Sequence, residues 1–115
     1  MKKFIIASAS LLALAAAAPA VAQNVSTLDQ SGTGNGATVT QSGSNNSDVD
    51  QNGTSNSATV SQTGTAAVSD VDQIGTSNTA TNTQTSLGGL ANVVQNGTLS
   101  RSTITQNDTA ANGAG

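Results

Sequence analysis

The 115-residue chain has no cysteine, histidine, tryptophan or tyrosine, and its one phenylalanine, one proline and one methionine all stand before Gln23. Without thiols and imidazoles it has no disulfides, no Cys/His zinc site and none of the common nucleophile and base pairs of hydrolases. Because no aromatic ring follows Gln23, it has no stacking platform for bases. We predict a protein that is not an enzyme, with no cofactor, no metal and no small-molecule substrate.

Positive charge is nearly absent as well. From Gln23 onward Arg101 is the one basic residue against six aspartates, which gives a net charge of −5. Nucleic acid and anionic membrane surfaces are therefore poor partners.

Large aliphatic residues are also few, with eight Val, four Leu and two Ile in the same part of the chain. These side chains cannot bury enough apolar surface to offset the conformational entropy that an ordinary globular domain loses on folding. Another arrangement must therefore order the chain.

The N-terminal segment before Gln23 has the pattern of a secretory signal peptide. Lys2 and Lys3 precede an apolar stretch over residues 4–18, and Ala20-Val21-Ala22 forms a small-x-small cleavage site. A retained membrane anchor is the alternative, although the apolar run is short for a bilayer. We predict cleavage before Gln23 and export through the periplasm, so that the product is secreted, extracellular or on the cell surface.

Glutamine reveals an internal repeat, which carries most of the information. Eight glutamines recur at every eleventh position, except that one interval is a single residue shorter. Branched aliphatic residues stand two positions before seven of the eight, and Ser or Ala stands four positions before each. Asparagine often stands six positions before, and glycine two positions after. The glutamines are Gln30, Gln41, Gln51, Gln62, Gln73, Gln84, Gln95 and Gln106; the asparagines are Asn24, Asn35, Asn45, Asn56 and Asn78; the glycines are Gly32, Gly43, Gly53, Gly64, Gly75 and Gly97.

Strict alternation over the positions around each glutamine is typical of a β-strand with two different faces, and we interpret the glycines that follow as turn glycines. The outward positions alternate between units, Asp-rich in one and Thr-rich in the next, so the true repeat consists of two units and two strands. The predicted fold is all-β: a two-sheet cross-β solenoid of about four 22-residue coils. It would span residues 23–106, followed by a flexible tail at 107–115. The short interval, between Gln41 and Gln51, should lie in a turn, since a deletion within a strand would reverse every side chain.

Stacking of like strands at about 4.8 Å would place each inward amide over the next. Because an amide both donates and accepts, we predict side-chain ladders along the glutamine and asparagine columns, which substitute for the missing core. The sheet edges at both ends of such a solenoid are open, and residues 23–115 contain no Pro or Lys to protect them. Further copies should therefore add head to tail into a homopolymer.

These positions resemble the curlin repeat, the pattern Ser-x5-Gln-x-Gly-x-Gly-Asn-x-Ala-x3-Gln of bacterial curli fibre subunits. The match is close from Leu28 to Gln41 and recurs in the following units, over about residues 24–106. The resemblance implies a secreted functional amyloid for adhesion and biofilm matrix. It also implies export through an outer-membrane pore and assembly on a nucleator or with a major curli subunit. This chain departs from the family in lacking aromatic residues and a Gly-rich leader.

Two outward faces allow further interpretations. Asp48, Asp50, Asp70 and Asp72 would stack as like charges, and we interpret them as gatekeepers that slow premature assembly; a cation site is the alternative. The Thr-x-Thr columns, such as Thr38 with Thr40, are similar to the face of ice-binding solenoids. A soluble secreted β-solenoid that binds ice or a surface through this face is therefore the alternative function. Threonine is also simply a good residue for an exposed strand.

Overall fold

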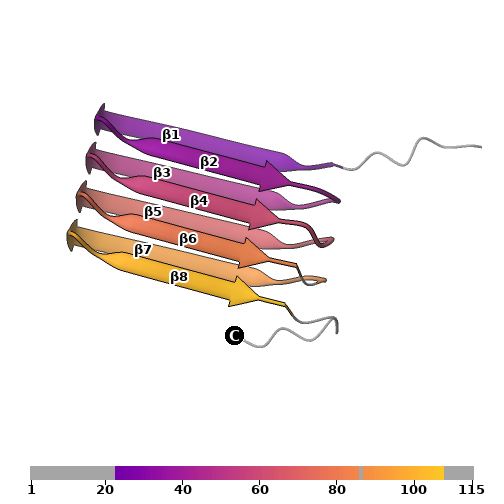
Figure 1. The fold of residues 1–115 in the computed structure, drawn as a ribbon. Coiled ribbons are helices and arrows are strands. Elements are labelled where there is room, and N and C mark those ends of the chain that lie inside the picture. The colour runs from indigo at the N-terminus through magenta and orange to yellow at the C-terminus, as the bar shows by residue number, and fades with distance from the viewer. Residues whose placement is uncertain (1–22, 86, 108–115) are drawn as a thin grey trace, which may run out of the picture.

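The computed structural model describes residues 23–85 and 87–107, which fold into two parallel sheets stacked face to face (Figure 1). The sheet orders are β1-β3-β5-β7 and β2-β4-β6-β8, so each coil contributes one strand to each sheet. No helix occurs within these residues. The predicted all-β, two-sheet solenoid of four coils is confirmed. The strands are β1 (Val25–Thr33), β2 (Gly36–Gln41), β3 (Asn46–Thr54), β4 (Ser57–Gln62), β5 (Val68–Thr76), β6 (Thr79–Gln84), β7 (Leu90–Thr98) and β8 (Arg101–Gln106).

The predicted signal peptide, residues 1–22, lies outside the described residues. So does the predicted tail, apart from Asn107.

Equivalent positions of successive coils pair directly in the ladders. Gln51 of β3 is the partner of Gln30 in β1 and of Gln73 in β5, and Val49 pairs with Val71 in the same way. The shortened interval lies in a connection, as predicted: residues 42–45 join β2 to β3, whereas residues 63–67 join β4 to β5. Losing a residue there keeps every inward side chain inward.

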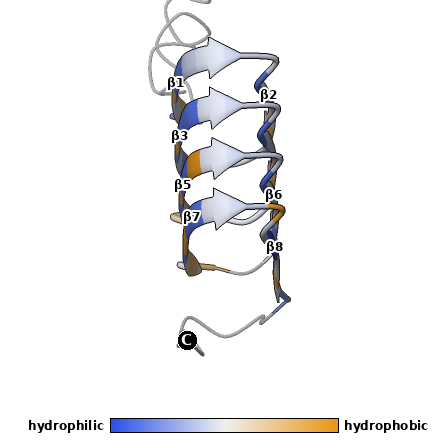
Figure 2. Cartoon of the chain, turned by 90° about the vertical axis from the view of Figure 1, so that its left-hand side faces the viewer, coloured by the Kyte–Doolittle hydropathy of each residue, from blue (hydrophilic) through white to orange (hydrophobic). Residues whose placement is uncertain are grey.

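The space between the sheets is filled by more polar than apolar side chains. In β3 buried and exposed residues alternate strictly from Asn46 to Asn52, and the apolar core is a small cluster around Val49, Val60 and Val71. Eleven polar residues are buried in the described part, against eight hydrophobic ones. Figure 2 shows the two sheets edge-on, on opposite sides of this interior. Stability must therefore come largely from the way the buried polar groups are paired.

The glycines do not all lie in turns, which corrects the sequence-based interpretation. Gly43 and Gly64 lie between strands, but Gly32, Gly53, Gly75 and Gly97 lie within β1, β3, β5 and β7. The reason is that the ladder continues beyond each glutamine of these strands, through a glycine with positive φ that bends the strand without ending it. The tight turns follow later, at Gly34-Asn35 in the first coil and at the equivalent places in the others.

Candidate functional site

The inward glutamines form two continuous columns of amide hydrogen bonds along the solenoid. Gln51 Nε2 donates to Gln73 Oε1 at 2.7 Å, and Gln62 Nε2 donates to Gln84 Oε1 at 2.8 Å. All four of these side chains are fully buried. Every bond runs in the same direction, from one coil to the next. One column consists of Gln30, Gln51, Gln73 and Gln95, and the other of Gln41, Gln62, Gln84 and Gln106.

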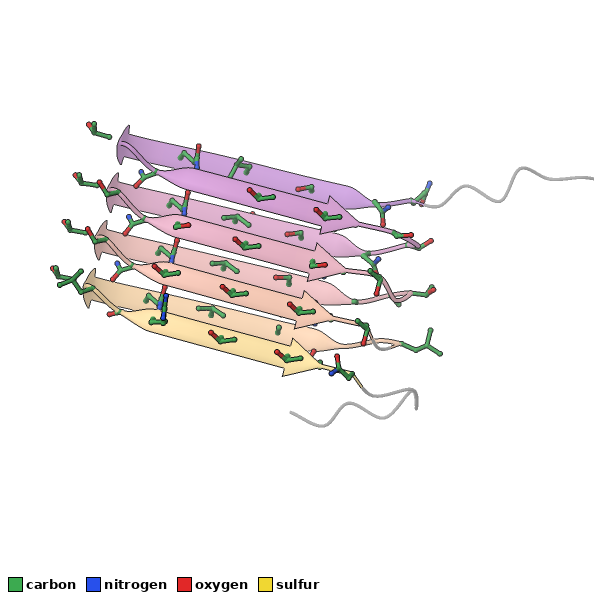
Figure 3. The ribbon with its side chains drawn as sticks, viewed as in Figure 1. Carbon is green, nitrogen blue, oxygen red and sulfur yellow. The ribbon has the colours of Figure 1, made fainter. Side chains whose placement is uncertain are left out.

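The second N–H of each interior amide ties the two sheets together. Gln73 Nε2 also donates to the carbonyl oxygen of Ser57 in β4, the strand of the other sheet in the preceding coil, at 3.1 Å. Gln62 Nε2 donates across to the carbonyl oxygen of Asn46 at 3.0 Å. A buried amide that uses both its protons and its oxygen bears little desolvation penalty. The columns therefore act both as axial ladders and as bridges between the sheets. Figure 3 shows how side chains recur at matching places in successive coils.

The asparagines stack in columns but bond to backbone rather than to each other, which differs from the predicted side-chain ladder. Asn56 Oδ1 accepts from the backbone N–H of Asn78 at 3.0 Å, and its Nδ2 donates to the carbonyl oxygen of Gly75 at 3.1 Å. Asn24, Asn35, Asn45 and Asn78 accept from the following coil in the same way. Each asparagine stands just outside a strand, and all but Asn24 lie in a connection between two strands, so the short side chain reaches backbone groups that the ladder leaves free.

One inward position interrupts the aliphatic column of the second sheet. Asn82 stands between Val60 and Ile104, fully buried, and donates to Ser69 Oγ at 2.6 Å. Within the described residues its Oδ1 has no hydrogen-bond partner, and neither has Ser47 Oγ. Each such group costs about 1–3 kcal/mol. The second and third coils therefore each contain one buried polar atom that has no hydrogen-bond partner among the described residues.

The strand glycines allow a close approach that sequence reasoning missed. A Cβ added at Gly53 would lie 2.0 Å from the carbonyl oxygen of Gly75, and one at Gly32 or Gly75 would lie 1.9 Å from that of the next glycine. Backbone of successive coils fills the space on that side. The recurrence of glycine at one position was the signal, but only the structure shows that contact between coils, in addition to chain bending, requires it.

The five aspartates of the described residues lie on the outer face of the first sheet. Asp48 pairs with Asp70, and Asp50 with both Asp29 and Asp72. Partial desolvation, and then the neighbouring carboxylates of Asp29, Asp72 and Asp48, raise the pKa of Asp50 above its ordinary range. The last coil carries Asn92 and Val94 at these positions, so the acidic columns end before it. Among the described residues no group of three or more His, Cys, Asp or Glu side chains could hold a metal ion.

The threonine columns lie on the outer face of the second sheet. Thr38 pairs with Thr59, and Thr81 continues the column to Thr103. The ice- or surface-binding alternative stays a prediction.

Comparison with known proteins identifies the repeat. Residues 24–47 match the curlin associated repeat, a stretch that covers β1, β2 and the start of β3. The chain carries a curlin repeat. The predicted resemblance is thereby confirmed. No curated protein and no solved structure matches the chain. The curlin repeat family is structural rather than enzymatic, and its proteins are extracellular curli subunits. The curlin repeat and the β-solenoid fold together support a curli-like structural subunit. None of the residues that the structure describes forms a helix long and apolar enough to cross a membrane.

Proposed function

We propose that the protein is a structural subunit of extracellular curli-like amyloid fibres that serve adhesion and the biofilm matrix. The observation that carries this proposal is that none of the described residues covers the edges of the two sheets. β1 and β7 are the edge strands of one sheet, and β2 and β8 those of the other. Each presents a row of backbone N–H and C=O groups that a further parallel strand can pair with.

The interior of the solenoid already has the features of a cross-β fibre. Its strands are parallel and in register, its identical side chains stack, and its amides form ladders. One more copy at either end would extend these features without any change of conformation. The contact is heterologous and does not close on itself, so repeated addition gives a filament.

We infer the rest of the assembly route from the sequence and from its resemblance to the curlin repeat. Residues 1–22 direct export and are removed, the solenoid spans residues 23–106, and residues 107–115 form a tail. An outer-membrane pore releases the chain, and a nucleator or a major curli subunit provides the first surface on which it assembles.

Fibre formation is tested on the protein purified after export, with its N-terminus determined by mass spectrometry. We expect unbranched fibrils in the electron microscope, with fibre reflections near about 4.8 Å along the axis and about 10 Å across it. A protein that remains monomeric under concentrations and times at which other curlin-repeat proteins polymerise would contradict the proposal.

The acidic face should slow assembly in a pH-dependent manner. The raised pKa of Asp50 means that the folded chain binds more protons than the unfolded chain in the window just above the ordinary aspartate pKa. Folding is therefore favoured as the pH falls through that window, and it is opposed at neutral pH, where the stacked carboxylates are charged. We expect a lag time several-fold shorter at mildly acidic than at neutral pH, measured by thioflavin fluorescence.

The matched variant replaces Asp48, Asp50, Asp70 and Asp72 with Asn, which keeps the shape of each side chain. Its lag at neutral pH should be short, and its response to acid should be much weaker. A variant with the unmodified lag and pH response would show that these side chains are not gatekeepers.

A further inference from the structure

The two ends of the solenoid are complementary steps rather than flat surfaces. At one end the inward side of β1 is uncovered: Leu28 is 49% exposed, whereas Val49 below it is 0% exposed. At the other end β7 is covered, with Val93 at 4%, but Ile104 of β8 is only half-buried. β1 thus overhangs one end and β8 overhangs the other, as the edge-on view in Figure 2 shows.

The unused hydrogen-bonding groups of the end glutamines also match. In the described residues Gln30 makes one amide bond, to Gln51, while interior glutamines of its column also bond to the coil before. Its oxygen and one N–H are therefore free. At the other end Gln95 Nε2 donates to the carbonyl oxygen of Thr79, and Gln106 Nε2 to that of Leu90, so each retains one N–H. One end offers acceptors where the other offers donors.

We propose that the joint between copies, in the fibre of the proposed function on which this inference rests, is directional and in register. β1 of the next copy pairs in parallel with β7 and lies against the overhanging β8. Gln95 then donates to Gln30 of the next copy, and Gln106 donates to Gln41 of the next copy. Gln30 of the next copy donates to the carbonyl oxygen of Arg101. This bond continues the pattern within one copy, in which the glutamines of the first sheet donate to the first residue of each strand of the second sheet: Gly36, Ser57 and Thr79, with Arg101 next in register. Leu28 of the next copy covers Ile104.

Charge and shape favour this joint over the reverse. The acidic columns end at Asn92 and Val94, so the joint places Val94 beside Asp29 of the next copy and brings no two carboxylates into one rung pair. At Gly97 an added Cβ would meet only Ser100 Oγ at 3.9 Å among the described residues. The space beside Gly97 is therefore open, whereas at Gly75 the backbone of the next coil occupies the equivalent space. Joining two β1 ends would instead turn the paired strands antiparallel and leave the remaining N–H groups of Gln95 and Gln106 without the oxygens of Gln30 and Gln41 as acceptors.

Direction is tested with two variants, each of which blocks one end. Leu28→Asp places a carboxylate on the overhang of β1, and Ile104→Asp places one on that of β8. Each alone should remain monomeric, because any joint would bury the new charge. An equimolar mixture should give a one-to-one heterodimer and stop there, as measured by light scattering and native mass spectrometry. Thr38→Asp, an added charge on the outer face of the same end coil, should still form fibres.

Homodimers of either end-blocked variant, or fibres formed by one of them alone, would overturn the directional joint. Circular dichroism reports whether each variant folds, and an independent set of variants tests the register.

That second set uses the absence of native cysteine. In fibres of Thr27→Cys/Asn92→Cys the two thiols of neighbouring copies would lie on adjacent strands about 4.8 Å apart, within the range that a disulfide spans. Within one copy they are separated by two intervening strands, β3 and β5. Oxidation should therefore give covalent multimers on a non-reducing gel. Asp48→Cys/Asp70→Cys, an in-register pair within one chain, sets the yield expected for such neighbours.

The offset pair Thr27→Cys/Val94→Cys is two positions out of register and should cross-link several-fold less. Stronger cross-linking of the offset pair, or dimers from Thr27→Cys alone, would overturn the proposed register. Such fibres would still support the proposed function, whereas unmodified protein that forms no fibres would contradict the function itself.

Discussion

Replacing Gly75 with alanine is expected to prevent the third and fourth coils from stacking. The new Cβ would lie 1.9 Å from the carbonyl oxygen of Gly97, and Gly75 has a φ of 121°, which alanine rarely adopts. Overpacking against backbone costs about 1–3 kcal/mol, and the backbone strain adds about the same. We expect a loss of about 4 kcal/mol in the free energy of unfolding, measured by urea denaturation, and no fibres.

Gly36→Ala is the matched control for this prediction. Gly36 has no positive φ, and a Cβ there would meet nothing within 4 Å. Alanine should therefore stabilise the protein by about 0.4–1 kcal/mol, because it restricts the unfolded chain. If the free energy of unfolding falls in Gly75→Ala and rises in Gly36→Ala, the loss comes from the contact between coils and not from replacing a glycine as such. Equal losses in the two variants would refute the contact argument.

Replacing Gln73 with leucine is expected to have the second large effect. The volume is nearly kept, but three partners lose their bonds: the amide of Gln51, the oxygen of Gln95 and the carbonyl of Ser57. Each buried group left unpaired costs about 1–3 kcal/mol, so we expect a loss of about 3–5 kcal/mol in the free energy of unfolding. Urea denaturation of the monomer and the thioflavin lag time measure the two consequences.

The control is the same substitution at the end of the same column. Gln30 is exposed and makes one amide bond, to Gln51, so Gln30→Leu should lower the stability of the monomer by only about 1 kcal/mol. Similar losses at the two positions would mean that leucine simply packs poorly in this interior. Little loss at either would mean that the amide columns do not hold the fold.

The sequence by itself determined the repeat, its division into strands and the direction of each side chain. The regular spacing of glutamine and the alternation around Val49 or Val60 fix which face is inward, because a strand has a period of two and a slip by a single residue would bury Asp48 or Thr59. The shorter interval between Gln41 and Gln51 could be assigned to a connection for the same reason. Strand periodicity depends only on residues that are close in the sequence, so a single sequence is enough to detect it.

Only the tertiary structure decided which contacts successive coils make and which groups remain exposed at the two ends. Asn56 was expected to bond to another side chain and bonds to backbone; Gly53 was expected in a turn and lies in a strand, where the next coil leaves no room for a Cβ. The overhang of β1 and β8 was not predicted at all. These features depend on the axial offset between the two sheets and on where each backbone carbonyl points. Neither is fixed by residue spacing, because both arise when strands that belong to different coils come into contact.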